Sequence, residues 1–172
     1  MFRQIPEEQQ IREFLDAYRE VVVESLMLIA HLDRPDFLCR RENGDDVGVE
    51  VTIVTRQPHE SFFEDAINGI RTMDADEAAS RIFDQVQRKD ALRNSPGWHL
   101  PENCILLLSI PDCPLSDLAD VLILEDYQEN GFEEIWIADH TEIEEYGQIE
   151  LFGLKPLKYW GHHRRDRGKP FG

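Results

Sequence analysis

The sequence predicts an α/β fold in which a mixed central sheet is flanked by helices. Three patterns predict it. Apolar residues near the N-terminus recur at helical spacing, residues 47–54 alternate as a strand does, and residues 104–110 are apolar on both sides, as in a central strand. The expected order is helix, hairpin, helix, strand, helix and strand, all within one domain over residues 1–172.

One long amphipathic helix is expected over residues 7–31, because apolar side chains recur along one face from Ile11 to Ile29. A hairpin follows Pro35, with strands at 37–39 and 47–54 and an Asn-Gly turn signal between them. On the second strand the valines and Ile53 share one face. The opposite face carries Gly48, Glu50 and Thr52.

The rest of the chain is expected to alternate between helices and strands. A helix in two pieces is predicted after His59, and its second piece begins at Thr72 or Asp74 and ends at 94–97. The expected elements after it are a strand at 104–110, a helix at 115–127, a strand at 134–138 and a short edge strand at 149–152.

Length and composition exclude several classes of protein. A chain of 172 residues with 41% hydrophobic residues can bury a core, which an acidic disordered tail cannot. No apolar run reaches the ~20 residues of a membrane helix, so no membrane partner is expected. The N-terminus lacks an apolar signal-peptide core, and the three cysteines form no CxxC pair. We therefore expect a cytoplasmic protein.

The net charge of −17 is unevenly distributed. Residues 155–172 hold six basic residues and one acidic residue, hence +5, whereas the body 1–154 carries −22. The acidic body excludes passive coating of nucleic acid or anionic lipid. The basic C-terminal tail, which also contains aromatic residues, has two interpretations: it folds back onto the body, or it contacts a nucleic-acid backbone or base.

Two carboxylates are the strongest candidates for chemistry. If the hairpin register is even, Asp36 lies across from Glu50, and both side chains converge on the open face of the hairpin. Carboxylate oxygens and water are the ligands that Mg²⁺ prefers, and a metal held there could activate water beside a phosphodiester. Gly48 on the same face would leave room for substrate. The alternative is an ordinary pair of acids on an exposed hairpin.

The segment Pro35-Asp36, followed by thirteen residues and Glu50-Val51-Thr52, resembles the PD-(D/E)XK signature of the restriction-endonuclease-like superfamily. The expected order of elements over residues 7–139 is similar to the core of that superfamily. The resemblance implies a restriction-endonuclease-like core, with Mg²⁺ or Mn²⁺ held by Asp36 and Glu50. Thr52 stands where the family has its lysine, which positions or activates the attacking water.

Two residues on the helix after the hairpin are candidate substitutes for that lysine. Lys89 falls close to the apolar stripe of its helix, and Gln85 lies one turn earlier at the edge of the stripe. The resemblance implies a glutamine or lysine on this helix. The alternative for Lys89 is structural, because a lysine near a helix C-terminus complements the dipole and lays its stem over the core. The acids Glu20 and Glu24 on the first helix are better explained as a solvated face.

Two functional hypotheses follow. The first is a Mg²⁺-dependent nuclease-like protein in which Asp36 and Glu50 hold the metal and Lys89 and Gln85 assist phosphodiester hydrolysis. The second is a non-catalytic, inhibitor-type protein on the same scaffold, whose acidic body binds a basic protein partner. The six histidines lack zinc-site spacing, and the sequence has no glycine-rich phosphate loop.

Overall fold

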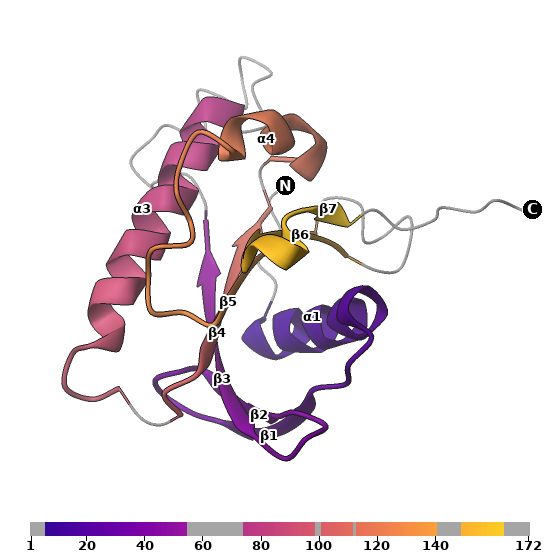
Figure 1. Ribbon diagram of the computed structural model, residues 1–172, viewed down its shortest axis with the longest axis vertical. Helices are drawn as coiled ribbons and strands as arrows, with labels where there is room; N and C mark the ends of the chain where they lie inside the picture. The colour runs from indigo at the N-terminus through magenta and orange to yellow at the C-terminus, as the bar shows by residue number, and fades with distance from the viewer. Residues whose placement is uncertain (1–5, 55–73, 99–100, 112, 141–148, 164–172) are drawn as a thin grey trace, which may run out of the picture.

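The chain folds around one seven-stranded mixed sheet with helices on both faces (Figure 1). This computed structural model describes residues 6–54, 74–98, 101–111, 113–140 and 149–163. The strands are β1 (Met27–His31), β2 (Phe37–Arg40), β3 (Asp46–Ile53), β4 (Cys104–Ile110), β5 (Glu134–Asp139), β6 (Glu150–Lys155) and β7 (Gly161–His163). The helices are α1 (Glu7–Val22), α3 (Ala75–Arg93), α4 (Leu115–Leu122) and the 3₁₀ helix η1 (Leu157–Tyr159). The α/β class and the mixed sheet are therefore confirmed.

The strands lie in the sheet in the order of the sequence. β1, β2 and β3 pair antiparallel, β3, β4 and β5 pair parallel, and β5, β6 and β7 pair antiparallel. Two parallel neighbours cannot be joined by a tight turn, so the connections that contain α3 and α4 must cross over the sheet. Every residue of β4 is buried, as the apolar run at 104–110 predicted.

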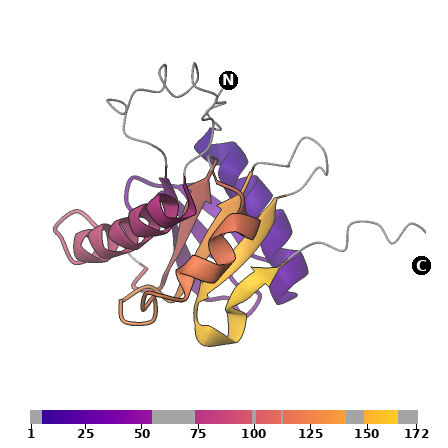
Figure 2. The ribbon, with the colours of Figure 1, turned by 90° about the horizontal axis from the view of Figure 1, so that it is seen from above.

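Two hydrophobic cores lie on opposite faces of the sheet. α1 packs on one face against the alternate residues of β3 and β4 that include Val49 and Ile105. α3 and α4 pack on the other face, where Leu106 and Leu108 of β4 meet Ile82 and Val86 of α3. Figure 2 shows the sheet between α1 on one side and α3 with α4 on the other. No helix among the described residues is long and apolar enough to span a membrane.

The single helix expected over residues 7–31 is wrong. α1 ends at Val22, where Val23 adopts a left-handed backbone with φ of 60°, and Met27–His31 forms β1. Short apolar runs fit the period of a helix and of a strand equally well. The pairing of β1 with β2 decides between them here, and β-branched residues at the end of α1 disfavour its continuation.

Three other boundaries differ from the expectation in smaller ways. α3 begins after Asp74 and ends at Arg93, as predicted, whereas the first piece of that helix falls outside the described residues. α4 ends at Leu122 instead of residue 127. The strand expected at 149–152 extends to Lys155 and is not an edge, because β7 pairs with its far side.

The first half of the basic tail is part of the folded body. Lys155 ends β6 and donates a 2.7 Å hydrogen bond to the carbonyl of Asn130. His162 on β7 pairs with Glu150 at 3.2 Å, and Trp160 packs against the core beneath α3 and α4. These contacts are those expected if the segment folds back onto the body. Residues 164–172 lie outside the described part of the chain.

Gly48 is a site where a single methyl group would disturb the hairpin. A Cβ there would lie 2.5 Å from Pro35 Cγ and 3.4 Å from Cys104 Sγ. We expect Gly48→Ala to lower the free energy of unfolding by about 1–3 kcal/mol, because the rigid proline ring and β4 cannot both move away. Chemical denaturation measures this. Gly131→Ala is the control, since a Cβ there meets only the guanidinium of Arg93, which can swing aside; an equal loss in both variants contradicts the prediction.

Candidate functional site

The register of the hairpin brings Asp36 and Glu50 together. Phe37 pairs with Val49, so Asp36, one residue before β2, lies opposite Glu50 on β3. Asp36 Oδ2 also accepts a 2.8 Å hydrogen bond from the backbone N–H of Val51. This bond fixes one carboxylate oxygen against the strand and leaves the other carboxylate oxygen for a second contact. The two acids thus have the even register that the hypothesis required.

Glu50 is a buried carboxyl group rather than an exposed one. It lies beside Leu106 of β4 on the face that α3 covers, and only 4% of its surface is exposed. Burial, the side-chain hydrogen bond with Asp36 and the charge of Asp36 raise the pKa of Glu50 to about 8, which Lys89 opposes. At neutral pH the pair therefore holds one proton between two carboxyl groups.

α3 brings Lys89 to the two acids. Lys89 Nζ lies 3.8 Å from Glu50 Oε2, which is ion-pair distance but longer than a hydrogen bond. Its side chain is about three-quarters buried, so its position is set by packing against the sheet and not by solvent. Asp36, Glu50 and Lys89 therefore form one cluster, the hairpin site, built from two strands and the helix that follows them.

Gln85 is not joined to this cluster. It lies half-buried one turn before Lys89 on α3. Within the described part of the chain, no recorded hydrogen bond links its amide to Asp36, Glu50 or Lys89. The structure thus places Gln85 on the expected helix without giving it a role in the site.

The face that carries the acids is covered, which corrects the expectation of an open one. α3 packs over it, Thr52 is buried beside Glu50, and the space above Gly48 is filled by Pro35 and Cys104. A covered face follows from β4 being apolar on both sides, since helices must shield each side from water. Thr52 Oγ1 finds no hydrogen-bond partner among the described residues, so this hydroxyl does not take over the work of a lysine.

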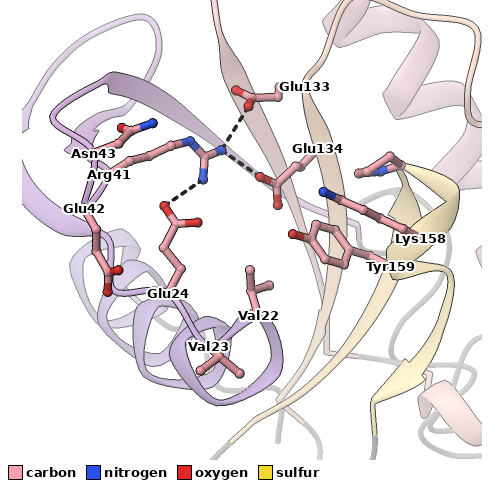
Figure 3. Close-up of a pocket in the computed structure, with 11 residues that line it drawn as sticks. Val22, Val23, Glu24, Arg41, Glu42, Asn43, Glu133, Glu134, Lys158 and Tyr159 are labelled. Carbon is pink, nitrogen blue, oxygen red and sulfur yellow. Dashed lines mark hydrogen bonds and ion pairs between the residues drawn. The ribbon is translucent and has the colours of Figure 1, made fainter.

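A second polar cluster, which the sequence did not suggest, surrounds Arg41. Figure 3 shows its guanidinium directed at three carboxylates. Nη2 lies 2.7 Å from Glu134 and 3.2 Å from Glu133, and Nη1 lies 3.3 Å from Glu24. Glu134 also accepts hydrogen bonds from Tyr18 and Trp136.

The Arg41 cluster forms part of the wall of an open pocket of about 650 Å³. Arg41 and Glu134 are both largely buried, and removing either partner of a buried ion pair is costly. The donors of Arg41 are directed at these carboxylates, so the cluster is best explained as the tie between α1, the hairpin and β5. Glu24, a candidate acid on the first helix, belongs to this tie and not to the hairpin site.

The Asp139-His140 dipeptide also has a structural role. Asp139 accepts a 3.0 Å hydrogen bond from the backbone N–H of Leu115, at the first turn of α4. His140 lies 2.9 Å from Glu13 through Nδ1 and 3.3 Å from Ser109 Oγ through Nε2. Burial lowers the pKa of His140, which keeps the imidazole neutral beneath α1.

Comparison of the chain with protein-family models, with curated proteins and with solved structures finds no match. Among the described residues, no group of three or more His, Cys, Asp or Glu side chains is placed to hold a metal ion. A cation at the hairpin site would therefore take two ligands from the described residues, Asp36 and Glu50, with water or substrate completing its shell.

The raised pKa of Glu50 makes the stability of the protein depend on pH. Between about pH 4.3, where an unfolded glutamate titrates, and about pH 8, the folded state holds a proton that the unfolded state has lost. Stability due to Glu50 is therefore complete below this window and falls as the pH rises through it.

We expect Glu50→Gln to remove this slope, so that the variant gains stability over the wild type by a few kcal/mol on going from pH 4.5 to pH 9. Denaturant unfolding in metal-free buffer at both pH values measures the gain. Glu102→Gln, at an exposed position, is the matched control and keeps the slope of the wild type. Parallel pH profiles for wild type and Glu50→Gln would falsify the assignment.

Proposed function

We propose that this chain is a divergent restriction-endonuclease-like protein that hydrolyses phosphodiester bonds of nucleic acid with Mg²⁺ or Mn²⁺ at the hairpin site. The observation that supports the proposal is the convergence of Asp36, Glu50 and Lys89, from two strands and a helix, at one point. The order α1, hairpin, α3 and β4 agrees with what the resemblance implies, with β1 as an additional strand.

The chemistry of the two carboxyl groups suits a divalent cation. Without a cation, one proton between Asp36 and Glu50 relieves their repulsion, and Lys89 contributes a second positive charge. A cation bound by both carboxylates replaces that proton, so binding releases a proton near neutral pH. Such a cation supplies a Lewis acid for the phosphate and lowers the pKa of bound water.

The residues of the chain position the reacting groups. Asp36 is held by the backbone of β3, so its free oxygen has a fixed direction. Lys89 is an ammonium donor beside Glu50 and takes the place on α3 that Thr52 leaves open on β3. Its charge can orient an attacking water or offset the charge that develops on the phosphate. The aromatic and basic tail supplies contacts to the nucleic-acid backbone that the acidic body lacks.

We expect the purified chain to cleave DNA or RNA only with Mg²⁺ or Mn²⁺, and Asp36→Ala to abolish the activity. Lys89→Ala should reduce the rate roughly 100-fold, the size typical of losing a positioned acid or base group. Arg88→Ala is the matched control, because Arg88 is exposed on the same helix. Gel assays give the rates and calorimetry gives metal binding with proton release.

The absence of metal-stimulated cleavage, together with the absence of Mg²⁺ or Mn²⁺ binding by calorimetry, contradicts this proposal. Metal binding without cleavage of any nucleic acid keeps the site and rejects the reaction. Equal rates for the Lys89→Ala and Arg88→Ala variants reject the role of Lys89.

The second candidate function is a non-catalytic acidic protein that binds a basic protein partner. The burial of Glu50 under α3 and the threonine at the position of the family lysine favour it. A net charge of −17 steers a basic partner and speeds association. If this function holds, a captured partner is basic, and its Kd rises at least roughly tenfold between low and high salt, as screening predicts. A salt-insensitive Kd measured by interferometry contradicts it.

A further inference from the structure

The edge of the sheet formed by β1 is exposed and apolar. Among the described residues, β1 pairs with β2 on one side and has no strand on the other. Met27 is 63% exposed, Leu28 40% and Ile29 39%. An edge strand has unpaired backbone N–H and C=O groups along its free side, which can pair with a strand of another chain.

Exposed apolar surface concentrates at this edge. The described residues include seven large hydrophobic side chains that are exposed, and four of them lie between Val23 and Ile29. The segment from Ser25 to Leu32 contains no Lys, Arg, Asp, Glu or Pro, the residues with which proteins commonly block an edge. In a chain with 31% charged residues, such a stretch is a marked local exception.

The opposite edge of the sheet differs. β7 has three residues, Gly161–His163, all partly buried, and His162 is paired with Glu150. A short, polar strand of this kind discourages pairing with another sheet. The contrast between the two edges indicates that β1 is the one suited to a partner.

We propose that β1 is the interface of a homodimer, in which β1 of a second copy pairs antiparallel with it about a two-fold axis at Ile29. This inference goes beyond the proposed function and does not depend on it. The two-fold axis makes the pairing self-complementary. Ile29 has no partner on β2, because the register shifts between Leu28 and Ala30, and in the dimer it faces Ile29 of the second copy.

Charges at the ends of β1 favour this register. Centred on Ile29, antiparallel pairing sets Met27 against His31 of the second copy and brings the segment with Glu24 alongside the exposed turn that contains Arg34. The symmetry produces this opposite-charge pair twice. Parallel pairing would instead bring like-charged segments together, so the charges select the antiparallel arrangement.

The net charge predicts how the dimer responds to salt. Two copies of −17 repel each other at long range, whereas the two exposed charge pairs contribute only about 0–1 kcal/mol each. Salt screens the long-range repulsion first. Dimerisation should therefore strengthen when the ionic strength rises from about 20 mM to about 300 mM. A basic foreign strand at this edge would show the opposite response.

Analytical ultracentrifugation of the full chain over about 1 µM to 1 mM protein tests the proposal. The wild type should show a monomer–dimer equilibrium. Ile29→Lys places two ammonium groups at the axis and should raise the dimer Kd at least roughly tenfold. Leu124→Lys is the matched control, because Leu124 is 76% exposed outside β1, and it should leave the Kd unchanged.

A cross-link tests the register independently. Cβ atoms of directly opposite residues in an antiparallel pair lie within disulfide reach, so Ile29→Cys should give a covalent dimer under mild oxidation. The three native cysteines are buried and do not compete. Leu124→Cys should remain monomeric in the same conditions. A wild type that stays monomeric at all concentrations overturns the proposal, and so does an equal response of the Ile29 and Leu124 variants.

Discussion

The burial of β4 on both faces is the constraint on which the rest of the structure depends. Cys104–Ile110 has no exposed residue, so its two neighbours in the sheet run parallel and helices shield both faces. α3 must therefore cross the face of β3 on its way to β4. That crossing places Lys89 over Glu50, and it also explains why the acids are covered.

A carboxyl group in this position is expensive and needs a reason. Burial raises the pKa of Glu50 to about 8, so the protein keeps a group that destabilises its folded state at alkaline pH. Asp36, held by the N–H of Val51, increases this cost through its own charge. Structural acids such as Glu134 are instead matched by Arg41, Tyr18 and Trp136. The contrast favours a functional role for the hairpin site, because strain of this kind concentrates where a ligand relieves it.

The sequence carries local patterns well and long-range partners poorly. The Asn-Gly turn and the alternation in 47–53 were sufficient to predict the hairpin and the even register of Asp36 and Glu50, and the apolar stripe of α3 placed Lys89 near the sheet. The apolar run Leu26–Ile29 fits a helix or a strand, so only the pairing with β2 reveals β1. The Arg41 tie joins residues 93 positions apart, and no spacing in the sequence indicates such a contact.

The two proposals combine into one geometrical consequence. An antiparallel pair of β1 strands requires a two-fold axis perpendicular to the sheet, so both copies present α3 on the same side of a continuous sheet. β3 is two strands from the edge, so five strand spacings separate the two β3 strands, or about 24 Å. Two hairpin sites then face the same side at a spacing that only an extended polymer can bridge. A dimer therefore suits a nucleic-acid substrate better than a small molecule, which would engage each hairpin site separately.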